Sequence, residues 1–379
     1  MKASIWNKTC LFGAFLICLA CSNSVFGFQV PKNVFKDIPI IEYDGKVIIG
    51  EDDIFENESF NFPVGIQYIS RTDDFVLLDT GNRGMYFFSS DGSFKRRIGS
   101  IGQGPGEFIN PLLFAVNRDE NIYVYDSRNM RINIYNYDGS FINSFRVTNI
   151  YPEKGIESNF VITGSNDVVF NSPSRTGHYF SVVSQDGKLR NIGRIIKLDR
   201  DERINNMGSL GKIIINNDMY YIFLQYLFLL RIYNEKGLLT REVKLDILTG
   251  KPDIRKEIDL SDHLKRIDRG SYGAARIKLV NDIKMYNDNM YILTGLTGNE
   301  IREKSNNYIL VYNRDSLKLE KIINLNITNK KPDDNIRSEY VLFCIKNDET
   351  VYMVHRTGIS DGRRVYYIYS IEMFNKRAQ

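Results

Sequence analysis

Arginine is the side chain in this sequence whose type and spacing come closest to a chemical site. Eight arginines recur in short polar stretches that follow strand-like segments, namely Arg83, Arg128, Arg131, Arg175, Arg302, Arg356, Arg363 and Arg364. A guanidinium group presents planar hydrogen-bond donors that match carboxylate and phosphate oxygens. Gathered on one face, these side chains would bind an anionic ligand such as an acidic glycan or an acidic protein segment. The alternative is solvated loop charge, with Arg131 holding neighbouring backbone instead.

Histidine is scarce, which limits metal chemistry. The three histidines are His178, His263 and His355, and we interpret His178 and His355 as lying in equivalent loops of two repeating units. Catalytic zinc sites use three protein ligands, and this sequence supplies at most two histidines to one place. We therefore predict no metal, no cofactor, no catalytic residue and no enzymatic activity. A metal-dependent hydrolase or lyase that uses His178 and His355 is the alternative.

Other polar residues complete the candidate site. Asp79 and Asp126 end two strand-like runs ahead of Asn82 and Asn129, and we expect these carboxylates to accept backbone N–H bonds that close a loop, not to bind a metal. No EF-hand spacing of acids and no Gly-Lys-Ser/Thr phosphate loop occurs. The predicted ligand-binding residues are Arg83, Arg128, Arg131, Arg175, His178, Gln225, His355 and Arg356.

These residues lie in a repeated unit. Residues 75–94, FVLLDTGNRGMYFFSSDGSF, align without a gap with residues 122–141, IYVYDSRNMRINIYNYDGSF, at a period of 47 residues. Each unit contains a strand, a polar loop, a second strand, an Asp-Gly turn and a third strand. Weaker copies cover 168–189, 219–239, 290–319 and 350–373, which makes six units. This period, without 3.6-residue apolar spacing, is typical of a four-stranded propeller blade.

The intervals between units each add one more strand. PLLFAVNRDE, residues 111–120, is expected to be the innermost strand of its blade and to line a central channel. The glycine-rich stretch 98–108 carries the chain into that strand from the outer strand of the preceding blade, because glycine permits a sharp change of direction. The segment 38–51 is expected to pair with the run VYYIYSIEM, residues 365–373, and to close the ring.

We therefore predict an all-β, six-bladed propeller of four-stranded antiparallel blades, with five or seven blades as alternatives. Residues 102–141 resemble an NHL repeat, at positions Gly102, Gly104, Pro105, Gly106, Phe108, Pro111, Ile122 to Val124, Asp126, Asn129, Arg131 and Ile132. The first unit matches less closely, and the other four match by spacing. The resemblance implies an exported bacterial propeller. It says little about function, because NHL-like propellers include binding scaffolds, receptor modules and some metal-dependent lyases or lactonases.

The N-terminal stretch predicts export. Lys2 and Lys8 precede or border the apolar run 10–21, which is too short to span a bilayer comfortably. Cleavage before Cys21 makes residues 1–20 the signal peptide and Cys21 a lipidated residue, whereas the alternative cleavage site ends the signal at residue 27. Residues 28–379 are predicted to form a single propeller domain with an insertion at about 246–283 that contains a short helix.

Composition narrows the partner classes. Lys and Arg number 50 against 46 Asp and Glu, so the net charge of +4 gives no general attraction to nucleic acid. Only Cys344 lies outside the signal region, which excludes a disulfide framework. The single tryptophan, Trp6, lies in the signal, which lowers the case for a sugar ligand. We predict an exported binding or scaffold protein of the periplasm or outer membrane. Its ligand, carbohydrate or protein, lies at the channel mouth, and its membrane contact is limited to the lipid anchor.

Overall fold

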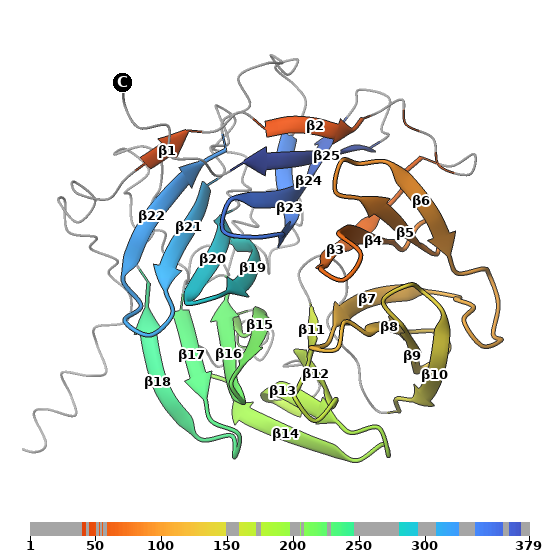
Figure 1. The fold of residues 1–379 in the computed structure, drawn as a ribbon. Coiled ribbons are helices and arrows are strands. Elements are labelled where there is room, and N and C mark those ends of the chain that lie inside the picture. Colours follow the sequence, from red (N-terminus) through yellow and green to blue (C-terminus); the bar gives the residue numbers. More distant parts are fainter. Residues whose placement is uncertain are drawn as a thin grey trace, which may run out of the picture.

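Six sheets stand around one axis (Figure 1). The computed structural model describes residues 40–42, 45–50, 53, 55, 59–148, 159–171, 176–197, 205, 208–225, 229–245, 280–294, 308–325, 338–358 and 364–372. Each sheet is one blade, and its first strand contacts the first strands of the two neighbouring blades, so the inner strands form a closed circle. This arrangement confirms the prediction of an all-β, six-bladed propeller with four-stranded antiparallel blades.

The first five blades are each built from four consecutive strands. The first blade contains β3 (Pro63–Ile69), β4 (Asp74–Asp79), β5 (Gly84–Ser89) and β6 (Phe94–Ile98). The second contains β7 (Pro111–Val116), β8 (Ile122–Asp126), β9 (Arg131–Tyr135) and β10 (Phe141–Arg146). The third contains β11 (Phe160–Ile162), β12 (Val168–Asn171), β13 (His178–Val183) and β14 (Leu189–Arg194). The fourth contains β15 (Gly211–Asn216), β16 (Met219–Leu224), β17 (Leu229–Tyr233) and β18 (Leu239–Lys244). The fifth contains β19 (Val280–Tyr286), β20 (Asn289–Thr294), β21 (Tyr308–Asn313) and β22 (Leu319–Asn324).

The sixth blade joins the two ends of the fold. It contains β23 (Ser338–Ile345), β24 (Thr350–Gly358) and β25 (Arg364–Glu372), and its outer strand is β2 (Gly45–Ile49). β2 pairs antiparallel with β25, and Ile49 lies opposite Ile368. This pairing confirms the predicted closure of the ring. The preceding strand, β1 (Ile40–Glu42), adds in parallel to β22, so the N-terminal segment covers the outer edges of two blades.

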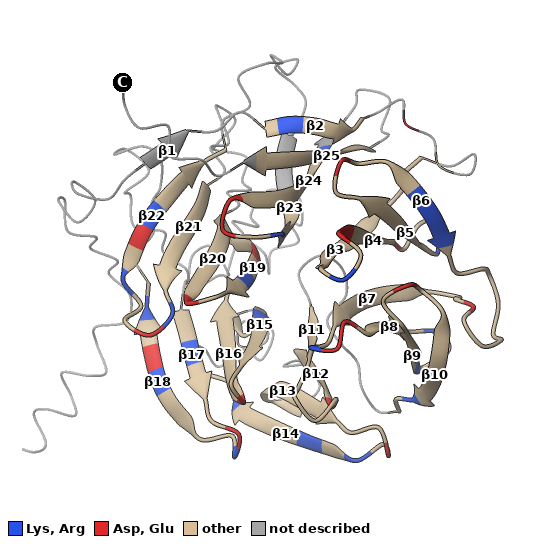
Figure 2. Cartoon of the chain, viewed as in Figure 1, with Lys and Arg blue, Asp and Glu red and all other residues tan. Residues whose placement is uncertain are grey.

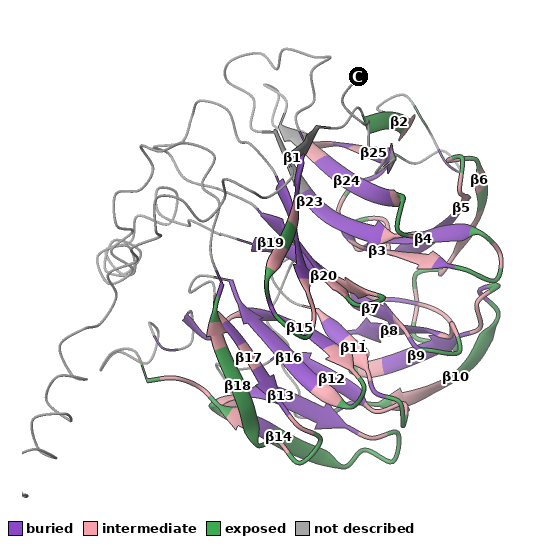
Figure 3. Ribbon diagram, turned by 60° about the vertical axis from the view of Figure 1, so that its left-hand side comes forward, coloured by how far each residue is buried: buried purple, intermediate pink, exposed green. Residues whose placement is uncertain are grey.

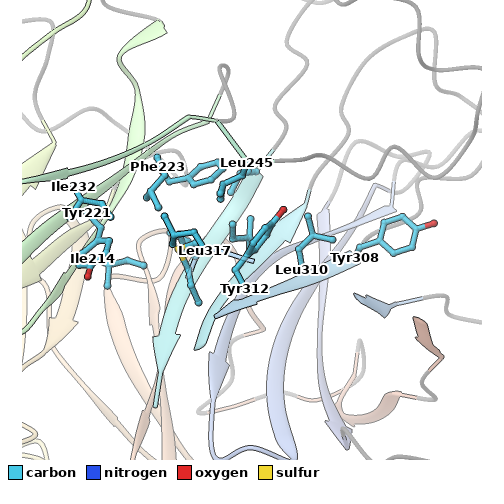
Figure 4. Packing of buried hydrophobic residues seen from close by; sticks show 14 of the residues in the cluster. Ile214, Tyr221, Phe223, Ile232, Leu245, Tyr308, Leu310, Tyr312 and Leu317 are labelled. Atoms are coloured by element: carbon cyan, nitrogen blue, oxygen red, sulfur yellow. The ribbon is translucent and has the colours of Figure 1, made fainter. Parts of the chain in front are cut away.

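The apolar core lies between neighbouring blades. Strands near the axis and in the middle of each blade are largely buried, whereas outer strands such as β10, β14 and β18 are mostly exposed (Figure 3). Between the fourth and fifth blades, Tyr221 and Phe223 of β16 belong to the same buried cluster as Leu310 and Tyr312 of β21 (Figure 4). Neighbouring blades cover both faces of these inner and middle strands. Aromatic and branched side chains therefore occupy successive positions, without strict alternation of apolar and polar residues.

The predicted Asp-Gly turns join the third and fourth strands of their blades. Gly92 and Gly139 have φ of 94° and 85°, in the left-handed region that glycine adopts without strain. Each of these turns also lies over the outer strand of the preceding blade. A Cβ atom on Gly92 would be 2.6 Å from the carbonyl oxygen of Ile48, and one on Gly139 would overlap the side chain of Ile98. The glycines are thus required both by φ and by blade-to-blade packing.

The turns between first and second strands link neighbouring blades by polar contacts. Glu120 of the second blade accepts a hydrogen bond from the backbone N–H of Ser70 at 2.7 Å. Asn117 Nδ2 donates to Asn166 Oδ1 at 2.8 Å, which links the second blade to the third. Where the ring closes, Lys346 Nζ of the sixth blade lies 2.6 Å from Asp73 Oδ1 of the first.

Asp73 is the centre of this closing contact. Its carboxylate accepts hydrogen bonds from Tyr68 Oη at 2.6 Å and Ser90 Oγ at 2.7 Å, in addition to the Lys346 ion pair. Partial burial alone would raise the pKa of Asp73, but the donors Lys346, Tyr68 and Ser90 outweigh it and lower the pKa to about 2. The ionised form of Asp73 therefore favours the folded state.

A pH-dependent stability difference follows for Asp73→Asn. Because the folded pKa is lowered, the contribution of Asp73 is complete above the unfolded pKa near 4 and is lost as pH falls toward 2. We expect the wild-type urea midpoint to fall between pH 4 and pH 2.5 more steeply than that of Asp73→Asn. The two proteins can be compared by urea unfolding across this range. Parallel curves would show that the closing contact does not depend on Asp73 ionisation.

Several predictions concern segments outside the described residues. They are the signal peptide, Cys21 with its lipid anchor, and the helix expected in the 246–283 insertion. The last residues of that insertion differ from the prediction, because β19 already begins at Val280 and forms the inner strand of the fifth blade. Within the described part of the chain, no helix has the length and apolar character needed to cross a membrane.

Candidate functional site: the central channel

The loops between second and third strands are held from within by buried carboxylates. Asp126 accepts hydrogen bonds from the N–H groups of Ile109 at 2.8 Å and Asn110 at 3.0 Å, just before the inner strand β7. Asp79 accepts equivalent bonds from Asn61 at 2.7 Å and Phe62 at 2.9 Å. Burial raises the pKa of Asp79 despite these donors. Both carboxylates thus accept backbone N–H bonds, as the sequence analysis predicts.

Arg131 holds the glycine-rich link that precedes its blade. Its guanidinium donates to three backbone carbonyls, those of Gln103 at 2.8 Å, Gly104 at 2.6 Å and Glu107 at 2.9 Å. Asn129 and Tyr135, from the same side of the blade, donate to the carbonyls of Gly102 and Gly106. The residues that carry the NHL resemblance therefore fix the link to the second blade. Arg131 matches the alternative in which it holds backbone, because both of its terminal Nη groups donate to carbonyls of the link.

The other predicted arginines are spread over the blades. Arg83 is half-buried in the loop after β4, and Arg128 is exposed in the equivalent loop after β8. Arg356 lies in β24 and is half-buried. Arg175, Arg302 and Arg363 lie outside the described residues, as does the side chain of Arg364. The structure therefore places Arg83 and Arg128 in corresponding loops of adjacent blades and leaves a wider arginine rim as a prediction.

The two histidines do not occupy equivalent loops, which corrects the sequence interpretation. His355 is inside β24, is 4% exposed and packs against Tyr367 and Tyr369. Burial lowers its pKa to about 4, so the imidazole is neutral at neutral pH. His178 is the first residue of β13, and its Nδ1 lies 2.7 Å from the carbonyl oxygen of Thr176. The described residues contain no group of three His, Cys, Asp or Glu side chains placed to hold a metal ion.

Gln225 also lies deeper than the sequence indicates. It follows β16 directly, its backbone N–H donates to the carbonyl of Leu210 at 3.1 Å, and its side chain is 0% exposed. A fully buried amide is positioned to support the blade and cannot meet a ligand at the surface without rearrangement.

The central channel contains a cavity of about 320 Å³. The inner strands of all six blades contribute to its wall, and consecutive residues such as Lys212 to Ile215 line it together. Consecutive residues can do so because the sheets are radial and each presents the edge of its inner strand to the axis. β7 is one of these strands, which confirms its predicted place at the channel. The polar lining side chains are Gln67, Asn117, Arg118, Asn159, Lys212, Asp282 and Lys284.

The charged groups of this cavity are predominantly cationic. Arg118, Lys212 and Lys284 line it together with one carboxylate, Asp282. Lys212 is 2% exposed although it carries an ammonium group. Charged positions on β15 and β19 are visible beside the central opening (Figure 2). Since charge in a partly enclosed cavity is screened less than at the surface, the channel is suited to an anion.

The carboxylate of Asp282 already accepts hydrogen bonds from the protein backbone. Its Oδ1 accepts the N–H of Ile283 at 2.9 Å, and its Oδ2 accepts the N–H of Phe343, on the next inner strand, at 3.3 Å. Lys284 Nζ lies 3.5 Å from the same Oδ2. The carboxylate therefore ties β19 to β23 and forms an ion pair with Lys284. Lys212 and Arg118 are the other basic residues of the wall.

Asn159 plays a similar part between the third and fourth blades. Its side-chain Nδ2 donates to the carbonyl of Ile213 at 2.7 Å, and its Oδ1 accepts the N–H of Ile213 at 2.8 Å. The amide thus pairs with the edge of β15 as a further strand would. Backbone groups at this part of the channel are satisfied by the protein itself.

Most of the sequence matches a protein-family model. Residues 58–353 match the model of the family DUF5128, described as a 6-bladed beta-propeller. The chain belongs to this family. The blade count of DUF5128 agrees with the six sheets of the structure.

Solved structures with the same fold share little sequence with this DUF5128 chain. A protein of Bacteroides fragilis NCTC 9343, which carries the provisional description of an exported protein, is 14% identical. It aligns with a TM-score of 0.51 over 88% of this chain and 99% of its own. A member of the DUF4221 family from Bacteroides vulgatus ATCC 8482 is 11% identical, also with a TM-score of 0.51, over 89% and 99% of the two chains. These similarities show the fold.

A curated relative matches over a shorter stretch. Protein brain tumor of Drosophila melanogaster is 28% identical over 109 residues, which are 28% of this chain. The matched stretch spans only 10% of the length of that relative. The family assignment shows a β-propeller, and the assignment of its units to NHL repeats stays a prediction.

Sequence reasoning missed the cations of the channel. Lys212 lies in the strand GKIIIN, and Asp282 and Lys284 lie in VNDIKMY. A charged residue within a run that is otherwise apolar is the available signal, because few such strands bury a lysine without a reason. That signal becomes specific only when β15 and β19 are known to be inner strands.

Proposed function

We propose that this protein is an exported binding protein that holds an anionic ligand in its central channel. The observation that supports the proposal is the charge of the cavity wall, where Arg118, Lys212 and Lys284 outnumber the single carboxylate Asp282. The ligand class is a carboxylate or phosphate group carried by an acidic sugar or an acidic protein segment. Both bind through charge-assisted hydrogen bonds to ammonium and guanidinium groups.

The size of the cavity limits the part of the ligand that enters. A volume of about 320 Å³ is at the lower end of the range for small-molecule sites. One acidic unit of a longer molecule would fit, with the remainder outside. Arg83 and Arg128 would then contact this outer portion, together with Arg175 and other loop arginines of the same face. Of the predicted ligand-binding residues, Arg131, Gln225 and His355 support the fold in this scheme.

Location outside the cytoplasm is the second part of the proposal. It is supported by the basic and apolar N-terminal stretch with Cys21 as the candidate lipidated residue. The provisional description of the Bacteroides fragilis protein with the same fold is consistent with it. Mass spectrometry of the mature N-terminus would separate a lipid anchor at Cys21 from cleavage after residue 27.

The test of the channel site is the pair of variants Lys212→Met and Lys284→Met. Calorimetric titration with galacturonate oligosaccharides, and separately with inorganic phosphate, should show binding that weakens by about tenfold or more in Lys212→Met. The affinity of the wild type should fall as salt is added, because exposed parts of the site are screened. Lys284→Met should also weaken binding, because Lys284 lines the same cavity.

Lys46→Met is the matched control. Lys46 is an exposed lysine of β2, on the outer wall of the sixth blade, so its removal should leave the titration unchanged. Circular dichroism and thermal unfolding of each variant confirm that the ring is intact. Equal affinity in wild type and Lys212→Met would refute an anion site in the channel.

A further inference from the structure

A second recess lies on the outer wall, between the third and fourth blades. It has a volume of about 380 Å³ and is lined by β14, by the start of β13 and by the turn between β17 and β18. We call it the outer groove, and its functional lining is His178, Arg194, Arg231, Lys236, Leu238 and Leu239. We propose that the outer groove binds an extended acidic peptide segment of a partner protein. This inference does not depend on the channel site.

The walls of the outer groove are fixed by close packing. The turn at Gly237 crosses β14, and a Cβ atom on this glycine would be 2.9 Å from Ile192 Cγ2. Gly193 has φ of 66°, and a Cβ atom there would be 2.8 Å from the ring of Tyr233. Arg190 also crosses the seam, because its Nη1 donates to the carbonyl of Glu235 at 3.0 Å. The groove is therefore present before any ligand binds.

The charge of the groove selects an acidic partner. Its lining includes Arg194, Arg231, Lys236 and His178, and no acidic residue lines it within the described part of the chain. Arg231 is engaged by Glu242, with Nε 2.6 Å from Oε2. Arg194 and Lys236 are exposed, and neither makes an ion pair with another described residue, so each can offer a cation to a carboxylate.

The outer wall as a whole also carries more basic than acidic residues. The six outer strands contain ten Lys or Arg residues and two Asp or Glu residues within their bounds (Figure 2). Basic edge strands repel one another, so this wall disfavours pairing with a second copy of the same chain. It attracts an acidic segment from another protein instead.

The exposed apolar groups favour a peptide over a sugar. Leu238 and Leu239 are 63% and 46% exposed at the edge of the groove. Aliphatic side chains of this kind pack against aliphatic residues of a peptide, whereas sugar faces prefer aromatic rings. Alternating acidic and aliphatic residues would meet the cations and the leucines in turn.

One outer strand of this fold already accepts an added strand. β1 pairs in parallel with β22, the fourth strand of the fifth blade, so the outer edge of β22 is covered by an extended segment from far along the chain. β14 is the last strand of its sheet among the described residues. Its free edge can hydrogen-bond an extended peptide by the same strand addition, while Arg194 and Lys236 supply selectivity.

The experiment is fluorescence anisotropy with two labelled peptides, one of alternating Glu and Val and one of alternating Lys and Val. The Glu-Val peptide should bind the full-length protein at low salt, and the Lys-Val peptide should not. Arg194→Glu and Lys236→Glu should each weaken binding by about tenfold or more, because a cation is replaced by a repelling charge. A Glu-Val peptide with alternate N-methyl groups should also lose binding, since it cannot pair with the β14 edge.

Two controls separate this proposal from its alternatives. Lys46→Glu makes the same charge change on the wall of the sixth blade and should bind the Glu-Val peptide as the wild type does. Lys212→Met should also bind the peptide normally, which distinguishes failure of the channel site from failure of the groove. Unchanged binding in Arg194→Glu and Lys236→Glu would overturn the proposal. So would displacement of the peptide by galacturonate oligosaccharides of higher affinity, which would identify a glycan site.

Discussion

Replacement of Asp126 by alanine is expected to lower the free energy of unfolding by about 3 to 5 kcal/mol. The carboxylate is 0% exposed and accepts hydrogen bonds from the backbone N–H groups of Ile109, Asn110, Arg128 and Asn129. Alanine would leave these buried donors without an acceptor and would free the entry of β7. Urea unfolding followed by circular dichroism measures the loss.

Asp138→Ala is the matched control for Asp126→Ala. Asp138 is an exposed acid in the Asp-Gly turn of the same blade, and it accepts hydrogen bonds only from Ser140 among the described residues. We expect a loss of about 0.5 to 1 kcal/mol, because water can replace the carboxylate. Asp126→Asn should fall between the two, since the amide keeps one acceptor oxygen. Similar losses for Asp126→Ala and Asp138→Ala would contradict the structural part assigned to Asp126.

Replacement of Ile49 by aspartate is expected to open the ring and to lower the free energy of unfolding by about 4 kcal/mol or more. Ile49 is 1% exposed, lies opposite Ile368 and belongs to a buried cluster with Phe55 and Tyr366. A carboxylate at this place would lose its hydration without gaining a partner. Thermal unfolding and limited proteolysis should show an early release of β2.

Val47→Asp tests whether the loss of stability in Ile49→Asp comes from disrupted ring closure or only from a new charge on β2. Val47 lies on the same strand but is 44% exposed, so the new carboxylate stays in water. We expect a change of about 0.5 kcal/mol or less. If Val47→Asp and Ile49→Asp destabilise the protein equally, the effect comes from charge on β2, and burial of Ile49 against the sixth blade is not its cause.

Local features of the fold could be predicted because local chemistry determines them. The Asp-Gly pairs at 91–92 and 138–139 indicate turns, since few other residues accept the φ values of 94° and 85° observed there. Asp79 and Asp126 could be placed at loop entries because carboxylates cap backbone N–H groups next to them in sequence. Ring closure was predicted because strand-like segments at 38–51 and 365–373 can pair with each other.

The functional surface could not be predicted to the same degree, because it depends on distant strands. His355 was expected in a loop because its neighbours are polar, yet it continues the face of Val351 and Met353 and packs on tyrosines of β25. Lys212 and Asp282 are 70 residues apart in sequence and meet only because β15 and β19 are neighbouring inner strands. The outer groove likewise forms only where the third and fourth blades meet.

The overlap of the Asp-Gly turns with preceding blades has a consequence for the order of folding. The turn of the first blade lies on Ile48, which is held in place by β25 near the other end of the chain. The earliest blade to be synthesised therefore lacks its outer support until the latest strand is available. Contacts between such remote residues slow folding. The ring should therefore close late in folding, and once closed it should resist exoproteases.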